Sequence, residues 1–312
     1  MSIPTVLAPF RAEDGLADIA ACVRLHHYDA DDALPPAEVL DAVDFYVLPY
    51  SLSSDAAALM KQMPRLRAAQ LLSAGYEHVV PHVPAGVTLC NGRGIHDAST
   101  AELALTLMLA SQRNIPGYVR AQDRGEWRQE WRPSLADRRV LILGYGSIGA
   151  AIETRLLPFE VEVTRVASRA RQGVHSVDEL PELLPHAEIV VIVTPATELT
   201  RGMVDASFLA RLPDDALVVN VARGSIVDTD ALVAELECGR LRAALDVTDP
   251  EPLPAGHPLW HAPGVLISPH VGGPTSAFWP RAQRLVREQL TRFADGADLA
   301  NVVIPADASS RT

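Results

Sequence analysis

The chain has 312 residues, of which 48% are hydrophobic and 21% are charged. These values are typical of a folded globular protein with room for two domains, and they argue against a disordered chain. The 39 acidic and 27 basic residues give a net charge of −12, so nucleic acid is an unfavourable partner. Lys61 is the only lysine and follows no glycine-rich loop, which disfavours Schiff-base chemistry and P-loop phosphate binding.

The cysteines and the apolar runs indicate the cellular compartment of the protein. Cys22, Cys90 and Cys238 are far apart and show no paired spacing, so we expect no metal site and a reducing, cytoplasmic location. The N-terminal region carries charges at Arg11 and Glu13, and no apolar run reaches about 18 residues. We therefore expect neither a signal peptide nor a membrane partner.

Short β-rich runs alternate with helical segments in the first part of the chain, which is typical of an α/β fold. The runs are Thr5–Leu7, Val23–His27, Phe45–Leu48, Ala68–Leu72 and Val87–Cys90. Ser99 and Glu102 then form a capping-box pattern that predicts the start of a helix. Because Leu103–Ala110 is apolar on nearly every side, we expect this helix to be buried, either in a core or between domains or subunits.

A second series of β-branched runs follows the segment around Trp127 and Trp131. Its members are Val140–Leu143, Val161–Val166, Ile189–Val193, Leu217–Val221, Ala243–Leu245 and Val265–Ile267. Continuous apolar runs indicate strands that are covered on both faces, and hence a parallel sheet. A last helix is expected over Ala282–Phe293, where it could pack on the first domain, and Pro305–Thr312 is expected to be a frayed tail.

The first run of this second series leads into a dinucleotide fingerprint. The strand Val140–Leu143 is followed by Gly144, Gly146 and Gly149 in the pattern GxGxxG and then by a helix. The first glycine permits a tight turn, the second lets a pyrophosphate approach the backbone, and the third allows close packing of helix on strand. The phosphates would meet the positive end of the helix dipole. The surrounding strands and helix make dinucleotide binding the favoured interpretation.

The end of the next strand indicates which dinucleotide binds. An NAD site usually has an acidic residue there for the ribose hydroxyls, whereas this chain has Ser168, Arg169 and Arg171. Two arginines can hold a 2′-phosphate by charge-assisted hydrogen bonds. We therefore expect NADPH to be favoured over NADH; the alternative is that these arginines belong to a solvated loop.

Three further residues follow successive strands of the second series. Arg223 offers a permanent cation for a carboxylate and a carbonyl. His270 offers a group that exchanges protons near neutral pH, and Glu251 can orient its ring. Each has an ordinary structural explanation on its own, but open α/β sheets bind ligands at the carboxyl ends of their strands. Together they predict reduction of a 2-oxo acid by hydride transfer.

At this point the chain resembles the D-isomer-specific 2-hydroxyacid dehydrogenases, over about residues 68–273. The likeness rests on Leu72–Gly75, the GxGxxG segment, Thr194-Pro195, Asn220–Asp228, Asp246–Pro252 and Ser268–Gly273. Leu157–Phe159, followed by Ser168 and Arg169, is most similar to the NADPH-using glyoxylate/hydroxypyruvate reductase branch. The resemblance implies a homodimer with a Rossmann-type doubly wound parallel sheet for the cofactor and a smaller flavodoxin-like substrate domain. We expect residues 1–97 and 285–312 to form the substrate domain and residues 98–284 the dinucleotide-binding domain.

The resemblance also implies roles for single residues. The catalytic trio would be Arg223, Glu251 and His270. The substrate would be bound by Ala74, Gly75, Tyr50 and Arg223, with the two backbone amides holding its carboxylate. The expected cofactor contacts are Gly144, Gly146, Ser147, Ile148, Gly149, Ser168, Arg169, Arg171, Thr194, Pro195, Val221, Ala222, Asp246, His270 and Gly272.

Two departures from the family pattern bear on the substrate. Pro49-Tyr50-Ser51 lacks the arginine with which phosphoglycerate-type members bind phosphate, so phosphorylated substrates are disfavoured. The segment that ends in His96 is also altered; we expect His96 to cap the neighbouring helix rather than line the pocket. Trp127, Trp131 or Trp279 could reach the mouth of an active site, although packing is the commoner fate of tryptophan.

Three alternatives to a small 2-oxo acid stay open. The same trio could act on a bulkier 2-oxo acid or on phosphite. A protein of this fold could instead be a non-catalytic sensor of nucleotides.

Overall fold

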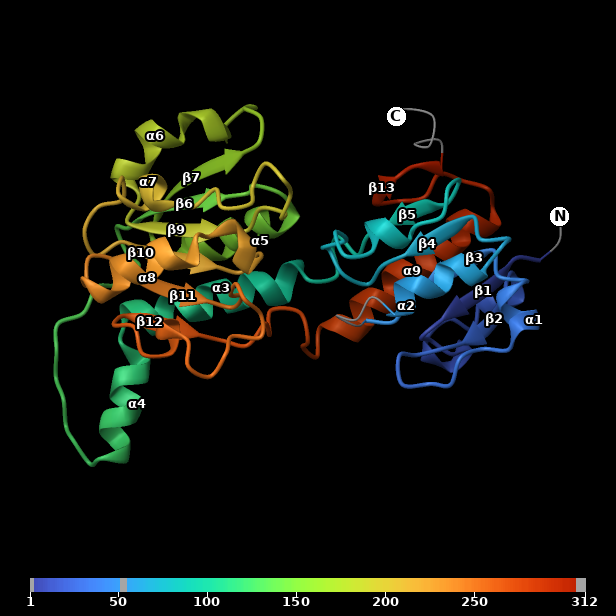
Figure 1. The fold of residues 1–312 in the computed structure, drawn as a ribbon, viewed down its shortest axis with the longest axis horizontal. Coiled ribbons are helices and arrows are strands. Elements are labelled where there is room, and N and C mark those ends of the chain that lie inside the picture. The colour runs from blue at the N-terminus through green and yellow to red at the C-terminus, as the bar shows by residue number, and fades with distance from the viewer. Residues whose placement is uncertain (1–2, 51–54, 307–312) are drawn as a thin grey trace. The chain divides into compact units, whose positions relative to one another are not determined.

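The computed structural model describes residues 3–50 and 55–306, which belong to two compact units (Figure 1). Unit 1 comprises residues 1–96 and 276–312, and unit 2 comprises residues 97–275. Each unit has its own sheet, so the mixed α/β class with two parallel sheets is confirmed. Ser51 and most of the tail expected over Pro305–Thr312 lie outside the described residues. Within the part of the chain that is described, no helix is both long enough and apolar enough to cross a bilayer.

Unit 1 is a six-stranded sheet in the order β13-β5-β4-β3-β1-β2. Five strands are parallel, and only β13 runs antiparallel, against β5. The strands are β1 (Thr5–Ala8), β2 (Arg24–His27), β3 (Phe45–Val47), β4 (Ala68–Gln70), β5 (Thr88–Cys90) and β13 (Val302–Ile304), and the helices are α1 (Ala37–Leu40), α2 (Asp55–Ala58) and α9 (Phe278–Ala294). The order 2-1-3-4-5 of the parallel strands is the flavodoxin-like one.

The packing of helix α9 explains why residues 276–312 belong to unit 1. Its buried residues recur three or four positions apart and share a core with β1 and β3; they are Phe278, Ala282, Val286, Leu290 and Phe293. One amphipathic face of this kind buries the helix as a whole. The division therefore falls at 275/276, ahead of the expected 284/285, and the helix begins at Phe278 rather than at Ala282.

Unit 2 is a seven-stranded parallel sheet in the order β12-β11-β10-β9-β6-β7-β8. The strands are β6 (Arg139–Leu143), β7 (Glu162–Ala167), β8 (His175–Ser176), β9 (Ile189–Ile192), β10 (Leu217–Asn220), β11 (Arg242–Leu245) and β12 (Val265–Ile267). Counted from β6, the order is that of a Rossmann sheet with one added strand, and it reverses between β6 and β9. Because all strands are parallel, their carboxyl ends lie on one edge of the sheet.

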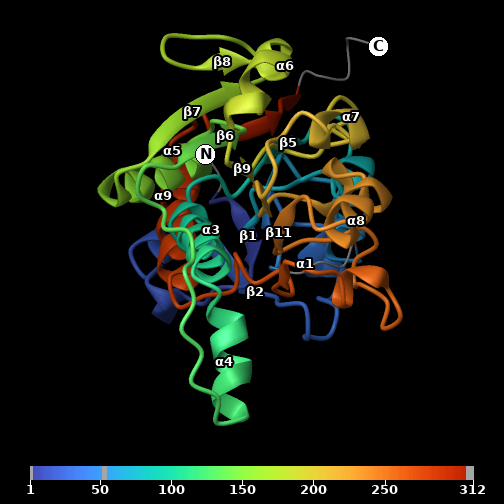
Figure 2. The same ribbon diagram turned by 90° about the vertical axis from the view of Figure 1, so that its left-hand side faces the viewer.

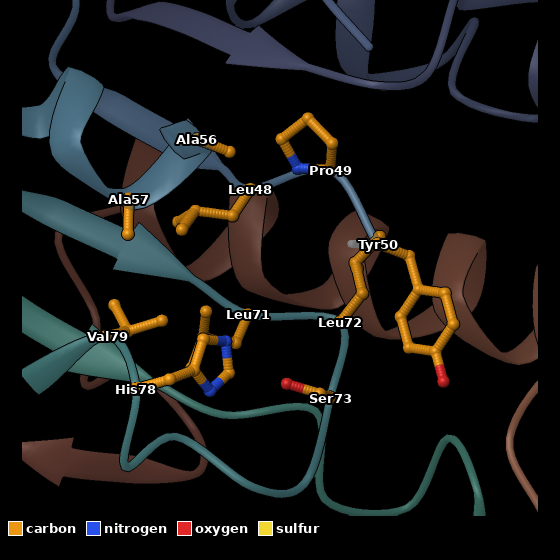
Figure 3. Close-up of a pocket in the computed structure, with 10 residues that line it drawn as sticks. All are labelled: Leu48, Pro49, Tyr50, Ala56, Ala57, Leu71, Leu72, Ser73, His78 and Val79. Carbon is orange, nitrogen blue, oxygen red and sulfur yellow. The ribbon is translucent and has the colours of Figure 1, made fainter. Parts of the chain in front are cut away.

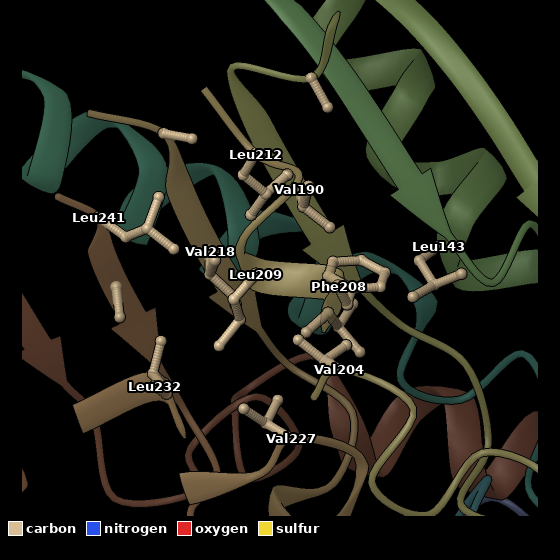
Figure 4. Close-up of a cluster of buried hydrophobic side chains, with 14 of the residues drawn as sticks. Leu143, Val190, Val204, Phe208, Leu209, Leu212, Val218, Val227, Leu232 and Leu241 are labelled. Carbon is tan, nitrogen blue, oxygen red and sulfur yellow. The ribbon is translucent and has the colours of Figure 1, made fainter. Parts of the chain in front are cut away.

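Helices cover both faces of this sheet, as the continuous apolar strands require. One hydrophobic cluster packs α6 (Leu180–Leu183), α7 (Ala206–Leu209) and α8 (Thr229–Glu237) on one face (Figure 4). A second cluster packs α3 (Asp97–Gln112) and α5 (Ser147–Leu156) on the sheet. The apolar helix of the sequence is thus a core helix of unit 2. It begins at Asp97, two residues before the expected cap, so Ser99 lies buried within its first turn.

A helix that the sequence patterns did not predict follows α3. This helix, α4 (Ile115–Asp123), projects away from the sheet of unit 2 in both views (Figures 1 and 2). The segment after it carries Trp127 and Trp131, which are 97% and 102% exposed. We call α4 and the segment through Trp131 the projecting arm. Its two fully exposed tryptophans form an apolar surface that a single domain leaves uncovered.

Candidate active site

The three glycines of the fingerprint form a tight turn after β6. Gly144 has φ +108°, and a Cβ there would lie 2.4 Å from the backbone nitrogen of Thr194, so only glycine fits. A Cβ on Gly149 would lie 2.7 Å from the carbonyl oxygen of Gly144, whereas a Cβ on Gly146 would meet no atom of the described residues within 4 Å. Among the residues that the structure describes, no side chain caps the N-terminus of α5 at Gly146. The space beside Gly146 and the uncapped helix end fit the pyrophosphate of a dinucleotide.

The end of β7 carries two cationic side chains. Ser168, Arg169 and Arg171 are all exposed. Arg169 has no hydrogen bond or ion pair with any residue that the structure describes. Arg171 donates to the backbone carbonyl of Tyr145, at 2.5 Å, and to no carboxylate within the described chain. Both guanidinium charges are therefore available to an anion at this edge of the sheet.

The turn after β10 positions Arg223. Asn220, which is buried, donates from Nδ2 to the carbonyl of Arg223 at 2.9 Å and accepts from the amide of Ala222 at 3.0 Å. The Arg223 guanidinium donates to the carbonyl of Ala222 at 2.7 Å, and it has no carboxylate partner among the described residues. The half-buried cation is thus held by its own turn and keeps donors free for an acidic ligand.

His270 and Glu251 are directly paired. Nδ1 of His270 lies 2.5 Å from Oε1 of Glu251, and because an ionised carboxylate can only accept, Nδ1 carries the proton. The opposite ring nitrogen, Nε2, is then the one that exchanges a proton with a ligand. His270 itself has φ +54°, and the peptide bonds Asp249–Pro250 and Glu251–Pro252 are cis. The two side chains are 26% and 35% exposed, so solvent and ligand can reach them.

Asp246 has a structural task that sequence reasoning did not identify. The residue is 3% exposed, and its carboxylate accepts three hydrogen bonds, from the hydroxyl of Ser268 at 2.6 Å and the amides of Val271 and Gly272 at 2.9 and 3.0 Å. The amide of His270 also donates to the backbone carbonyl of Asp246 at 2.8 Å. Asp246 therefore holds the turn that carries His270, whatever contact it makes with a cofactor.

All the candidate residues of unit 2 follow strands of one parallel sheet. Val221 and Ala222 precede Arg223, Gly272 follows His270, Ser147 and Ile148 begin α5, and Thr194 and Pro195 follow β9. The structure thus brings the fingerprint, the two arginines and the trio to the same edge of the sheet of unit 2. Open α/β sheets bind their ligands at this edge.

The candidate carboxylate loop lies in unit 1, after β4. Every backbone carbonyl from residue 72 to residue 75 accepts a hydrogen bond. The carbonyl of Leu72 accepts from Nε2 of His96 at 2.9 Å, and that of Ser73 accepts from the amide of Gly92 at 2.7 Å. The carbonyl of Ala74 accepts from the side chain of Asn91 at 2.8 Å, and that of Gly75 accepts from the Ser73 hydroxyl at 2.7 Å. The amides of Ala74 and Gly75 donate to no acceptor in the described chain. Adjacent amides without an internal acceptor are available to bind an anion.

His96 lies next to the candidate carboxylate loop in unit 1. His96 is 6% exposed, precedes α3 and donates a hydrogen bond from Nε2 to the carbonyl of Leu72, so it supports the candidate carboxylate loop. A Cβ on Gly92 would lie 2.6 Å from the Leu72 carbonyl oxygen, so a glycine is required for this close approach. The unusual sequence from Asn91 to His96 was the signal for this support, but its partner could not be read from the chain alone.

Tyr50 lies beside this loop. Its ring is 4.6 Å from Phe278 and 5.5 Å from His96, measured between centroids. Tyr50, Ser73 and His78 line one pocket of unit 1, where Ser73 and His78 point toward each other (Figure 3). Trp279 packs against Phe10 and Phe278 in unit 1, so aromatic packing is its role here.

A sheet with a dinucleotide fingerprint and a paired histidine and glutamate defines a nicotinamide-dependent oxidoreductase. A sequence profile for the D-isomer specific 2-hydroxyacid dehydrogenase, NAD binding domain, matches residues 105–272. The human glyoxylate reductase/hydroxypyruvate reductase is 30% identical over 285 residues, which are 86% of this chain and 86% of that protein. The glyoxylate/hydroxypyruvate reductase B of Salmonella newport is 32% identical over 70% of this chain and 72% of that protein. The chain belongs to the D-isomer specific 2-hydroxyacid dehydrogenase family.

Solved structures agree with this assignment. The NADPH-dependent glyoxylate/hydroxypyruvate reductase of Sinorhizobium meliloti, in complex with NADP and malonate, superposes with a TM-score of 0.78 at 26% identity and covers 97% of each chain. A D-isomer specific 2-hydroxyacid dehydrogenase of Xanthobacter autotrophicus, in complex with NADPH and MES, superposes with a TM-score of 0.80 at 29% identity. That match covers 99% of this chain and 100% of the other.

Proposed function

We propose that the protein reduces a small 2-oxo acid, of the glyoxylate or hydroxypyruvate kind, to the D-2-hydroxy acid with NADPH. The observation that carries the proposal is the hydrogen bond between His270 and Glu251 on the edge of the sheet that also carries Arg223 and the fingerprint. Curated relatives with about the same length and 30% identity are named for reduction of glyoxylate and hydroxypyruvate.

Each residue of the trio has one task in this proposal. The nicotinamide, when bound, supplies the hydride that becomes attached to C2 of the acid. Arg223 binds the 2-oxo acid and polarises its carbonyl, because its guanidinium has free donors. His270 donates a proton from Nε2 to the carbonyl oxygen, while Glu251 holds the ring by Nδ1. The amides of Ala74 and Gly75 bind the carboxylate, and Tyr50 borders the pocket beside them.

The preference for NADPH rests on the cations at the end of β7. Arg169 and Arg171 are exposed and have no carboxylate partner within the described chain, which leaves both charges for a 2′-phosphate. The Sinorhizobium and Xanthobacter proteins were solved with NADP and NADPH. The Arg169→Asp variant should lose affinity for NADPH far more than for NADH; equal losses would contradict this preference.

The chemistry is tested by removing the general acid. Steady-state rates over a panel of 2-oxo acids, with NADPH and with NADH, should show glyoxylate or hydroxypyruvate as the best substrate. His270→Ala should lower kcat by about 10²–10⁴-fold. Glu251→Gln should lower it by about 10–100-fold, because a hydrogen bond to a charged group contributes about 1.5–3 kcal/mol. Near-wild-type turnover of His270→Ala would overturn the proposal.

The same panel separates the alternatives. A best rate with a bulkier 2-oxo acid or with phosphite would keep the trio and change the substrate. No turnover with any acid, together with tight nucleotide binding, would favour a nucleotide sensor.

We also propose that two copies form a homodimer through the projecting arm of α4 and the segment around Trp127 and Trp131. A second copy is the occupant that the family resemblance implies, and the exposed tryptophans are the apolar surface it would cover. Trp127→Ser with Trp131→Ser should shift the protein to a monomer in sedimentation, whereas Trp260→Ser, half exposed outside the arm, should not. The cytoplasmic location stays a prediction.

A further inference from the structure

The aromatic ring inside the fingerprint lies close to the guanidinium groups of two arginines. Tyr145 stands between Gly144 and Gly146. The guanidinium carbon of Arg165 lies 5.7 Å from the centroid of its ring, and that of Arg171 lies 5.8 Å from it. Both distances are within the range in which a cation is attracted to an aromatic face. The two arginines nevertheless differ in how their charge is balanced.

The charge of Arg165 is balanced by Glu153. The Glu153 side chain is 7% exposed, and Nε of Arg165 donates to its two oxygens at 2.8 and 2.9 Å. The hydroxyl of Tyr145 donates to the same carboxylate. The bonds from Arg165 hold the pKa of Glu153 below its ordinary value, and the bond to Glu153 raises the pKa of Tyr145. A neutral phenol is thus fixed in place by an internal ion pair.

The same ion pair reaches the loop that carries the exposed arginines. Nη1 of Arg165 donates to the carbonyl of Gly173 at 3.3 Å. Arg171 and Val174 exchange backbone hydrogen bonds of 3.0 and 2.8 Å, which close the turn around Gly173. The side chain of Arg171 then returns to the carbonyl of Tyr145. Arg165 of β7 therefore joins Glu153 of α5 to the turn after β7, and Tyr145 bonds both to Glu153 and to Arg171 of that turn.

We propose that Tyr145 is a specificity-determining residue, a platform that holds Arg171 in position to bind the 2′-phosphate of the cofactor. The inference rests on the proposed NADPH preference and adds the residue that orients the cation. Because Glu153 neutralises Arg165, Arg165 is not a phosphate ligand; it holds the platform and the turn. Arg171, which has no acidic partner among the described residues, keeps its charge for the phosphate. A side chain already held in the binding geometry loses less entropy when the phosphate arrives.

The test measures nucleotide binding without the nicotinamide. Calorimetry gives the dissociation constants of adenosine 2′,5′-bisphosphate and of 5′-AMP, which differ only by the 2′-phosphate. Tyr145→Leu keeps an apolar side chain but removes the ring. It should weaken binding of the bisphosphate by about three- to tenfold and binding of AMP by less than about twofold. Tyr145→Phe, which keeps the ring, should retain most of the selectivity.

A double-mutant cycle shows whether Tyr145 acts through Arg171. In an Arg171→Ala background, Tyr145→Leu should have no further effect on the ratio of the two constants. The exposed Arg211 supplies the matched control, since Arg211→Ala removes the same charge outside this network. Thermal melting shows whether each variant is folded. If Tyr145→Leu does not fold, Tyr145→Phe and Arg171→Ala test the inference, because Tyr145→Phe should retain the selectivity for the bisphosphate and Arg171→Ala should lose it.

The outcomes separate this inference from the proposal beneath it. Equal weakening of both nucleotides by Tyr145→Leu, or no weakening, overturns the role of Tyr145 and leaves the NADPH preference standing. A wild-type protein that binds AMP as tightly as the bisphosphate overturns the preference itself, and the platform with it.

Discussion

Gly224 and Thr248 approach each other so closely that a Cβ on Gly224 would lie 1.9 Å from the Thr248 carbonyl oxygen. The contact joins the turn after β10, which carries Arg223, to the loop after β11, which leads to Glu251. The carbonyl of Asp249 also accepts from the hydroxyl of Thr229, at 2.8 Å, at the start of α8. Two parts of the candidate trio therefore depend on one backbone approach.

Substitution of Gly224 should disturb both loops together. In Gly224→Ala the backbone must shift, which should lower the free energy of unfolding by about 1–3 kcal/mol. A displacement of about 1 Å at Arg223 should lower kcat/KM by up to about 10²-fold. Urea unfolding and rates with glyoxylate measure the two effects. Gly256, where a Cβ meets nothing within 4 Å, is the control; Gly256→Ala should leave both unchanged, and equal effects at the two glycines would refute the explanation.

Asp246 should be needed for the turn of His270. In Asp246→Asn one acceptor oxygen becomes an NH2 group that faces backbone amides. A buried donor without a partner costs about 1–3 kcal/mol, and kcat should fall because His270 loses its support. Urea unfolding and steady-state rates measure both. Asp230→Asn, an exposed carboxylate on α8, should change neither, and an Asp246→Asn protein with normal stability would contradict the assigned task.

His96 should affect the substrate without affecting the cofactor. In His96→Leu the Leu72 carbonyl loses its buried partner, a bond that contributes about 0.5–1.5 kcal/mol. We expect KM for the 2-oxo acid to rise by about three- to tenfold, while the dissociation constant of NADPH stays unchanged. The exposed His186 provides the control variant His186→Leu. A change in NADPH affinity of the same size would show that His96 acts on the fold as a whole.

Cys90 should make the protein less stable at alkaline pH. Burial raises the pKa of the Cys90 thiol from its ordinary value of 9.0 to about 11. Between pH 9 and 11 the unfolded chain loses this proton while the folded chain keeps it, so stability falls as the pH rises, by about 2–3 kcal/mol. Urea unfolding at several pH values should show a steeper alkaline loss in the wild type than in Cys90→Ala. Cys238→Ala, at an exposed thiol, should follow the wild type.

The sequence predicted those features that depend on local pattern. The continuous apolar runs correspond to strands of the two sheets, and the GxGxxG segment forms the turn that its glycines require. Strand β8 was missed because it has two residues and too little pattern to distinguish it from a loop. The helix α4 was missed for a different reason, since Pro116 and Gly117 lie in its first turn and the dipeptide Pro-Gly is a sequence signal for a turn or loop.

For the candidate site, the residue types and their order were predictable, but their partners were not. The bond between His270 and Glu251 was expected, whereas the three donors to Asp246 and the bond from His96 to Leu72 were not. Such partners are set by tertiary packing between segments that no local pattern connects. The hydrogen bonds by which Arg165 links Glu153 to the turn around Gly173 were unpredictable for the same reason.

The discontinuity of unit 1 has a consequence for synthesis of the protein. Unit 2 is one uninterrupted segment that ends at residue 275, whereas unit 1 lacks α9 and β13 until residues 278–304 have been added. Domains generally fold as units while the chain leaves the ribosome. Unit 2 can therefore acquire its structure first, whereas unit 1, most of which is translated earlier, keeps the apolar surface that α9 covers exposed until α9 has been translated.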